Sequence, residues 1–300
     1  MGQHKKVIFD CDNTMGIEGC DVDDGLALLY LLGEGSSQVC GITTTYGNNN
    51  VEAVYANTIS MLEELRLTEI PVLKGYPQKS NLPQLTALES EASGFLVRRI
   101  NENPQEISIL ATGSLTNLWG AYQKDGETLS KAKEIVIMGG ITQELDINGK
   151  IMNELNLSCD PMATELVLKA GKNVSVITAN NCLDAYFSFE EFLAALETSQ
   201  EPIAEYILQK SRYWFEYMMN HYGLNGFYNW DVVAAVYLMK PELFVADYQA
   251  FAPTGKYLAT GLLKHPSDKE EATLINVPRI KNSEEFKNEV YRAWLRFVGA

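Results

Sequence analysis

The stretch between Val7 and Asp24 constrains the fold of this chain more than any other. Residues 7–9 form a short apolar run of the kind that builds a buried strand. Residues 26–32 form a second apolar run that is typical of a buried helix, and acidic residues stand at the position where this helix should begin. A buried strand followed directly by a buried helix is the first half of a βαβ unit, so this stretch predicts an α/β fold.

Carboxylates fill the connection between this predicted strand and helix. In an open α/β sheet the ligand crevice lies at the carboxyl ends of the strands, so these side chains should meet in one crevice. Like charges at short range repel and raise one another's pKa unless a positive charge sits among them. A hard divalent cation with several oxygen ligands removes that conflict, and the sequence therefore predicts a metal site. The carboxylates belong to Asp10, Asp12, Asp21, Asp23 and Asp24.

Strand and helix patterns alternate along most of the remaining chain, joined by short loops. This order predicts an α/β fold with a Rossmann-like, doubly wound and mainly parallel sheet. No repeat or linker divides the chain, so we expect one domain over residues 1–300. Strands are predicted at 38–46, 70–73, 107–111, 134–138, 174–178, 257–260 and 273–277. Helices are predicted at 51–65, 88–100, 118–122 and 161–170, through most of 187–238, and from residue 284 onward.

The net charge of −15 argues against a nucleic-acid or anionic-membrane partner, because both require clustered Lys and Arg. No apolar run reaches the roughly 18 residues that a membrane helix needs. Five scattered cysteines without a CxxC pair fit free thiols in a reducing compartment. With no signal-like segment before the first strand, we expect a cytoplasmic protein.

Polar segments follow five of the predicted strands, and a late acid adds to them. Each segment alone is typical of a loop, but together they would form a ring of donors and acceptors suited to a ligand rich in hydroxyl groups. Asp231 begins an apolar helix, and an aromatic-dense region precedes it, suited to core packing or to stacking on a heterocycle. The segments are Asp10/Asp12, 45–48, 112–117, 139 onward and 178–181.

Taken in order, these motifs resemble the nucleoside hydrolase family of the inosine-uridine preferring type. The resemblance implies a Rossmann-like fold, Ca²⁺-dependent hydrolysis of the N-glycosidic bond of ribonucleosides, and a homodimer or homotetramer. It spans residues 5–240 and is specific because all the blocks occur together. The blocks are Asp10-x-Asp12, Asp23-Asp24-x-Leu-Ala-Leu, Ile42-Thr-Thr-Thr-Tyr-Gly-Asn48, Ala111-Thr-Gly-Ser-Leu-Thr-Asn117, Val136-Ile-Met-Gly-Gly140 and Asn153-Glu-Leu-Asn-Leu-Ser-Cys-Asp-Pro161.

Carried over position by position, the resemblance implies a role for each site residue. Asp12 would be both the general base and a Ca²⁺ ligand, and acids around the sugar would favour the positive charge of the transition state. The other expected Ca²⁺ ligands are Asp24, the carbonyl of Thr112, and Asp231. The ribose would be held by Asp23, which we also count as catalytic, by Asn48, Asn148, Glu154 and Asn156, and by Met138 packing near the sugar.

Two departures from the family pattern bear on activity. The family's short Asp-Pro-Gly turn is replaced here by the longer segment 13–22, which alters the path of this loop and with it the geometry of the site. Trp230 stands where many members have His, which resembles the purine-preferring branch, in which an aromatic ring stacks on the base. We therefore hypothesise purine preference, with Trp230 as a catalytic stacking group. His221 is a candidate acid for the leaving base, although a surface position is the simpler expectation.

Two other functions remain open from the sequence. The motif Asp10-Cys-Asp12-Asn-Thr14 also matches a haloacid-dehalogenase-like phosphatase, with Asp10 as nucleophile and Asp12 as acid/base. That family expects a late Gly-Asp strand end, which this chain lacks after residue 160. The second alternative is a nucleoside- or ribose-binding protein that keeps the pocket but has little turnover because of the longer first loop.

Overall fold

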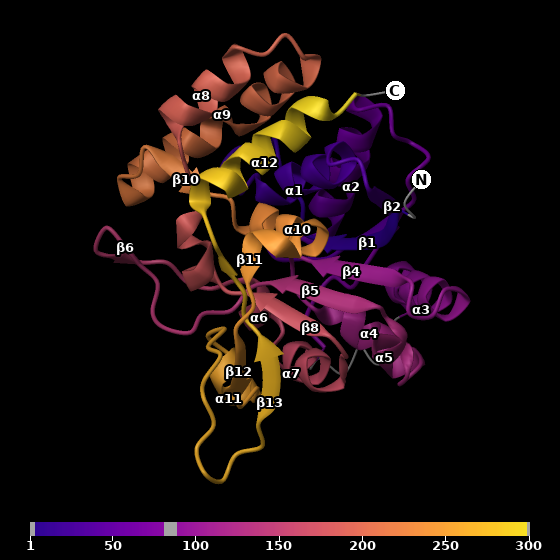
Figure 1. Ribbon diagram of the computed structural model, residues 1–300. Coiled ribbons are helices and arrows are strands. Elements are labelled where there is room, and N and C mark those ends of the chain that lie inside the picture. Colours follow the sequence, from indigo (N-terminus) through magenta and orange to yellow (C-terminus); the bar gives the residue numbers. More distant parts are fainter. Residues whose placement is uncertain (1–3, 81–88, 299–300) are drawn as a thin grey trace.

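The computed structural model describes residues 4–80 and 89–298, and it is built around one eight-stranded sheet (Figure 1). The spatial order of its strands is β12-β13-β8-β5-β4-β1-β2-β3. Only β12 pairs antiparallel to its neighbour, so the predicted mainly parallel, doubly wound α/β fold is confirmed. The strands are β1 (Lys5–Cys11), β2 (Ser37–Thr44), β3 (Val72–Lys74), β4 (Ile107–Ala111), β5 (Glu134–Met138), β8 (Val174–Ile177), β12 (Tyr248–Phe251) and β13 (Thr273–Asn276).

Strand β1 shows why the sheet is covered on both faces. Its side chains alternate, and Val7 and Phe9 enter one hydrophobic cluster while Ile8 enters the other. All three are fully buried, as a parallel sheet between two helical layers requires.

The helices form one layer on each face of the sheet (Figure 1). One cluster gathers α1 (Asp23–Gly33), α2 (Val51–Glu64), α8 (Phe189–Glu197), α9 (Pro202–Tyr222), α10 (Trp230–Met239) and α12 (Ser283–Arg296). The other gathers α3 (Glu91–Glu102), α4 (Thr116–Lys124), α5 (Thr128–Lys131), α7 (Pro161–Ala170) and α11 (Gly255–Leu258). Short elements complete the chain: β6 (Asp146–Ile147), β7 (Lys150–Ile151), α6 (Asn156–Cys159), η2 (Ala179–Asp184), β9 (Tyr186–Ser188), β10 (Gly226–Tyr228), η3 (Pro241–Leu243), β11 (Phe244–Val245) and β14 (Arg279–Ile280).

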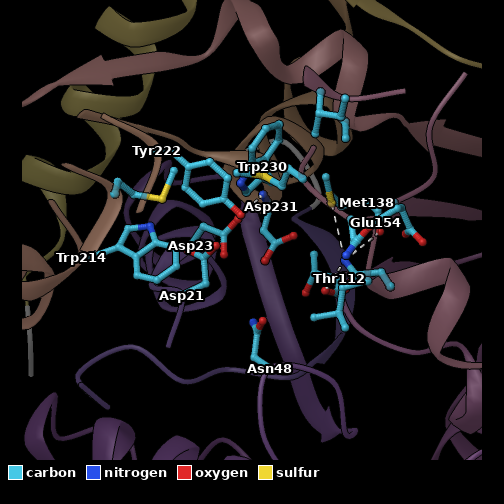
Figure 2. A pocket seen from close by; sticks show the side chains of 18 of the residues that line it. Asp21, Asp23, Asn48, Thr112, Met138, Glu154, Trp214, Tyr222, Trp230 and Asp231 are labelled. Carbon is cyan, nitrogen blue, oxygen red and sulfur yellow. Dashed lines mark hydrogen bonds between the residues drawn. The ribbon is translucent and has the colours of Figure 1, made fainter. Parts of the chain in front are cut away.

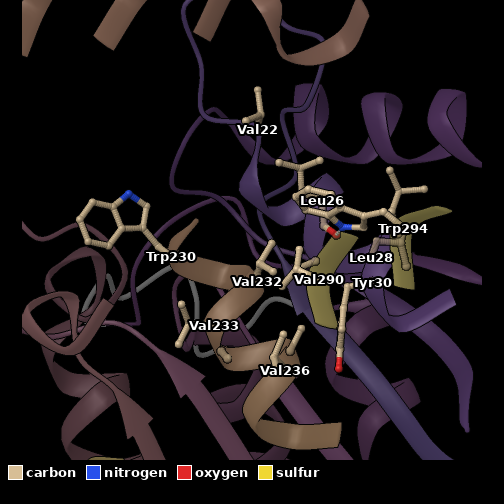
Figure 3. Close-up of a cluster of buried hydrophobic side chains, with 14 of the residues drawn as sticks. Val22, Leu26, Leu28, Tyr30, Trp230, Val232, Val233, Val236, Val290 and Trp294 are labelled. Carbon is tan, nitrogen blue, oxygen red and sulfur yellow. Dashed lines mark hydrogen bonds between the residues drawn. The ribbon is translucent and has the colours of Figure 1, made fainter. Parts of the chain in front are cut away.

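The packing of α1 against α10 positions the site. Helix α10 is apolar on almost every side and lies buried beside α1, with α12 covering both (Figure 3). The indole Nε1 of Trp294 on α12 donates a hydrogen bond of 2.9 Å to the carbonyl of Leu26 on α1. The acids that begin α1 and α10 are thereby held close together.

Two sequence-based expectations about elements need correction, and one strand was not predicted. The strand expected at 257–260 is wrong, because these residues belong to helix α11 and to the turn after it, where the amides of Tyr257 and Leu258 both donate to the carbonyl of Thr254. The strand that borders β13 is instead β12, which was not predicted. The helix expected at 88–100 begins at Glu91, after a Ser90 cap, and residue 88 lies outside the described residues.

No helix among the described residues is long and apolar enough to span a membrane.

Candidate active site

Two helix N-termini bring three carboxylates together. Asp23 and Asp24 begin α1, Asp231 lies in the first turn of α10, and one oxygen of each lies within 4.8 Å of the others. The backbone amide of Asp231 donates a 3.1 Å hydrogen bond to Oδ2 of Asp23, which links the two helices directly. Helix N-termini favour negative charge, yet three buried carboxylates at this spacing repel one another. This oxygen-rich set has the chemistry that a hard divalent cation requires.

Asp12 adjoins these three acids at the end of β1. Its Oδ2 accepts the backbone amide of Asn48 at 2.6 Å, and the Asn48 side-chain amide lies 3.4 Å from both Asp12 Oδ1 and Asp24 Oδ2. A Cβ at Gly47 would lie 1.9 Å from Asp12 Oδ2, so only glycine permits this close approach. The loop after β2 therefore fixes the carboxylate of Asp12 beside that of Asp24.

Thr112 closes the set from the end of β4. Its hydroxyl donates to Asp24 Oδ1 at 2.6 Å, and its carbonyl accepts Nδ2 of Asn156 at 2.8 Å. The same amide lies 3.1 Å from the carbonyl of Met138 at the end of β5. The ends of neighbouring parallel strands thus converge on one edge, as predicted.

Glu154 is held by backbone amides rather than by a positive side chain. Its Oε1 accepts from Gly140 and Leu157, at 2.9 and 2.7 Å, and its Oε2 accepts from Ser158 at 2.9 Å. Burial raises the pKa of this carboxyl, and the amides counteract the rise. Its orientation is therefore fixed before any ligand binds.

Burial makes the whole acidic group costly to ionise. Burial raises the pKa of Asp12 to about 6 and that of Asp10 to about 7. Burial, followed by repulsion from neighbouring carboxylates, raises the pKa of Asp24 and Asp231 well above the usual range. No ion pair between described residues involves any of these acids.

These shifts predict a pH-dependent stability in the presence of chelator. Below a pH of about 4, carboxyls are protonated in both the folded and the unfolded chain. As the pH rises toward 7, the unfolded carboxyls release protons first, so the free energy of unfolding falls. We expect Tm in EGTA to decrease between about pH 4.5 and pH 7, and added Ca²⁺ to reverse most of that decrease. Differential scanning calorimetry across this range tests the expectation, and a Tm that rises with pH in EGTA contradicts it.

A cavity opens over this acidic floor, and its opposite wall is aromatic (Figure 2). Rings from the C-terminal half of α9 and from the start of α10 form that wall. The described residues that line the cavity are Asp21, Asp23, Asn48, Thr112, Met138, Gly139, Leu145, Met152, Asn153, Glu154, Leu155, Asn156, Ala179, Trp214, Tyr217, Met218, Tyr222, Trp230 and Asp231.

Most of the residues predicted for the site lie at this cavity. Asp23, Asn48, Thr112, Met138, Glu154, Asn156, Trp230 and Asp231 line it. Asp12 and Asp24 do not line it but contact two residues that do, Asn48 and Thr112. The family resemblance predicted Asp12, Asp24 and Asp231 as the acids that bind the metal. The three acids whose oxygens lie within 4.8 Å of one another are Asp23, Asp24 and Asp231.

Asn148 and His221 lie outside the residues that line the cavity. The side-chain amide of Asn148 donates 2.9 Å to the carbonyl of Tyr222, which ties the β6–β7 hairpin to the end of α9. His221 is exposed and stacks on Tyr217, with ring centroids 3.8 Å apart. Asn148 is therefore not among the residues that line the cavity, and the surface position that was the simpler expectation for His221 is the one observed.

Several lining residues were not assigned to the site from the sequence. Asp21 was among the five acids expected in the crevice, but no particular role was assigned to it. Trp214 and Met218 lie on α9, and the aromatic density of this region was the only signal. Their cavity-facing position depends on how α9 packs, which a sequence pattern does not specify.

Asp10, the nucleophile of the phosphatase alternative, is fully buried and does not line the cavity. Its Oδ1 accepts hydrogen bonds from Thr43 at 2.5 Å and from Asn117 at 2.8 Å. A nucleophile must reach its substrate, so this placement argues against the phosphatase.

The fold and the site together define an α/β protein in which an acidic floor and an aromatic wall enclose a cavity. The family model described as inosine-uridine preferring nucleoside hydrolase matches residues 7–288. The chain belongs to this family and is a nucleoside hydrolase, an enzyme that hydrolyses N-glycosidic bonds.

Named relatives agree with this assignment. The chain is 27% identical to a probable uridine nucleosidase 2 of Oryza sativa subsp. japonica, over 80% of this chain and 75% of the relative. It is 28% identical to the pyrimidine-specific ribonucleoside hydrolase RihA of Salmonella typhi, over 84% of this chain and 85% of the relative.

Solved structures share the fold. A plant nucleoside hydrolase, PpNRh1, superposes with a TM-score of 0.83 at 23% identity, covering 97% of this chain and 99% of that one. A purine-preferring ribonucleoside hydrolase from Gardnerella vaginalis gives a TM-score of 0.80 at 21% identity, covering 98% and 99%.

Proposed function

We propose that this enzyme hydrolyses ribonucleosides to ribose and free base with a Ca²⁺ ion held by Asp12, Asp24, Asp231 and the carbonyl of Thr112. The observation that carries the proposal is the buried set of carboxylates, which has no positive partner among the described residues. Asp23, which shares the triad, lies close enough to contribute a further oxygen. A bound Ca²⁺ would lower the pKa of a water molecule and offset the repulsion between these acids.

Asp12 would act as the general base. Its pKa of about 6 lies near neutrality, where a base combines availability with proton affinity. Asn48 holds the carboxylate in one orientation, so a proton from the attacking water would pass to a fixed oxygen as the water adds to C1′ of the ribose. The surrounding acids favour the positive charge that develops on the sugar.

The same floor would hold the ribose. Asp23, Asn48 and Asn156 offer acceptors and amide donors to the sugar hydroxyls, and Met138 packs beside them. Glu154, already oriented by three backbone amides, keeps lone pairs free for a further hydroxyl. The rigid hydrogen bonds of these side chains support selection for ribose over a sugar that lacks a hydroxyl.

Incubating the protein with inosine and uridine, in Ca²⁺ or in EGTA, tests this proposal. We expect release of ribose in Ca²⁺ and its loss in EGTA, and no hydrolysis of a phosphate ester in Mg²⁺. Binding of nucleoside without release of base would instead support the non-catalytic alternative.

For the base we propose a purine preference, supported by the large aromatic wall and by the indole of Trp230 beside the acidic floor. The resemblance to the purine-preferring branch implies that an aromatic ring stacked on the purine raises the basicity of the leaving group. A pyrimidine preference is the second candidate, favoured by the named activities of the uridine and pyrimidine-specific relatives.

Replacing Trp230 with Ala should lower kcat/KM for inosine by roughly 10- to 100-fold, the range expected for loss of one base–aromatic stack. Uridine, with the smaller ring, should lose less. Trp230→Phe keeps an aromatic face and is the matched control. Steady-state kinetics on both nucleosides tests the expectation, and an unchanged rate on inosine counts against purine preference.

We also propose that residues 1–300 form one domain, since both hydrophobic clusters pack on one sheet. The resemblance to the family supports a homodimer or homotetramer, and the five free cysteines support a cytoplasmic location. Light scattering on the purified chain tests the oligomeric state.

A further inference from the structure

Gly261 lies against the carboxylate of Glu154, although it does not itself line the cavity. It belongs to the connection 252–272 between β12 and β13, far from Glu154 along the chain. A Cβ added at Gly261 would lie 2.0 Å from Oε2, 2.4 Å from Cδ and 2.6 Å from Cγ of Glu154. These three atoms are its nearest neighbours, so the side chain of Glu154 occupies the space that a side chain at 261 would need.

The backbone at this position also favours glycine. Gly261 has a φ of +70°, a left-handed conformation that glycine adopts without steric strain. It follows helix α11, and its amide donates a 2.9 Å hydrogen bond to the carbonyl of Leu258 in the last turn of that helix. The turn that ends α11 therefore brings the bare backbone of Gly261 up to Glu154.

Hydrogen bonds tie this turn to the end of β5. The amide of Ile141 donates to the carbonyl of Gly261 at 2.9 Å, and the amide of Leu263 donates to the carbonyl of Ile141 at 2.8 Å. Ile141 directly follows Gly140, whose amide donates to Oε1 of Glu154 at 2.9 Å. One short stretch after β5 thus holds both Gly261 and the carboxylate of Glu154.

The rest of the connection 252–272 is anchored as well. Leu258 and Leu263 are buried in the hydrophobic cluster that also contains α7. The amide of Gly255 donates to Oε2 of Glu165 on α7 at 2.7 Å. Because the turn is held at both ends, a side chain added at Gly261 should displace the end of the Glu154 side chain rather than the turn.

Glu154 faces the cavity beside Met138, across from Trp214 (Figure 2). Its three amide donors fix the direction of its oxygens, but they leave open how far the carboxylate can shift away from them. Gly261 fills the space on one side of Oε2 and Cδ, so it limits that shift. The amides and the glycine backbone together define one position for the carboxylate.

We propose that Gly261 is a positioning residue for Glu154, and that the connection between β12 and β13 thereby sets the affinity of the enzyme for ribose. This inference rests on the proposed function, because it requires that Glu154 hold a hydroxyl of the sugar. Gly261 contacts neither the metal acids nor the attacking water in this scheme, so its effect should be confined to binding of the nucleoside.

Replacing Gly261 with Ala tests the proposal. We expect KM for inosine and for uridine to rise about tenfold or more, as loss of a hydrogen bond to a charged group produces. The Ca²⁺ concentration for half-maximal activity should stay within about twofold, because the metal acids lie on β1, α1 and α10. A purely structural defect would reduce the amount of folded enzyme, which lowers the apparent kcat and leaves KM unchanged.

A double-mutant cycle with Glu154→Ala identifies the contact. Glu154→Ala removes all three atoms that the added Cβ would meet. It should raise KM by itself, and the double variant should match it within about twofold, whereas independent effects would multiply. Any Tm lost in Gly261→Ala should be largely regained in the double variant. If Gly261→Ala does not fold, the double variant should fold, and failure of both to fold contradicts the proposal.

Gly35→Ala is the matched control for backbone strain. Gly35 has a φ of +93° in the turn between α1 and β2, and its added Cβ would make only an ordinary contact, 3.4 Å from Nη2 of Arg296. Its KM should equal that of the wild type. If the wild type hydrolyses nucleosides and Gly261→Ala keeps the same KM, this inference is overturned and the proposed function stands. If the wild type hydrolyses neither inosine nor uridine, the proposed function is overturned and this inference with it.

Discussion

Replacing Asp12 with Asn is expected to lower kcat for nucleoside hydrolysis by about a thousandfold, within the range that loss of a general base produces. The amide of Asn accepts no proton at neutral pH, although it has nearly the same shape. Its carbonyl oxygen still accepts the Asn48 amide that now binds Asp12 Oδ2 at 2.6 Å, so the loop after β2 should stay in place. Ribose release at saturating inosine measures kcat, and quenching of tryptophan fluorescence measures binding.

Asp10→Asn is the matched control for this experiment. Asp10 is also fully buried and lies two residues earlier, but its Oδ1 contacts Thr43 and Asn117 and it does not line the cavity. We expect a loss of stability and a far smaller loss of kcat. If Asp10→Asn abolishes turnover while Asp12→Asn keeps more than a tenth of it, Asp12 is not the base and the phosphatase-like assignment of the two acids regains support.

Replacing Asp231 with Asn should have the second-largest effect. It should weaken the activation by Ca²⁺ and raise the Tm of the protein in EGTA. Removing one carboxylate from the triad removes a ligand, so the Ca²⁺ concentration needed for half-maximal activity should rise by about 100-fold or more. In EGTA the same change removes repulsion from Asp23 and Asp24, so Tm should increase. Activity against free Ca²⁺, and calorimetry in EGTA, measure the two effects.

Asp160→Asn provides the contrast, because this buried carboxylate is satisfied by hydrogen bonds. Its oxygens accept from the Ser80 amide at 2.6 Å and hydroxyl at 2.7 Å, from Thr116 at 2.8 Å and from Ala163 at 3.1 Å. Its replacement should lower Tm with and without Ca²⁺ and leave the Ca²⁺ dependence unchanged. A lower Tm in EGTA for Asp231→Asn would show that the triad is not under repulsion, and would contradict the metal assignment.

The strands and helices of the sheet could be predicted because their patterns are local. Residues 107–111 and 134–138 were expected as strands and are observed with the same bounds. Their burial on both faces gives mostly apolar runs, and Thr112 follows the first run while Gly139 follows the second. The edge strand β12 was not predicted, because it forms through its pairing with β13 and has no clear strand pattern of its own.

The acids at the end of β1 and at the start of α1, and Thr112 after β4, could likewise be placed from the sequence, because parallel strands bring their carboxyl ends to one edge. Asp231 was placed beside them only through the family resemblance. The structure supplies the physical reason, since α10 is buried against α1 and their N-termini meet.

The sequence by itself determined the α/β fold, the acidic strand ends and the family. Only the tertiary structure decided which side chains face the cavity. Asn148 holds the end of α9 and His221 stacks on the outside, whereas Asp21 and Trp214 line the wall. The physical reason is that the orientation of a loop or of a long helix depends on distant packing partners, and these are not encoded in the spacing of its own residues.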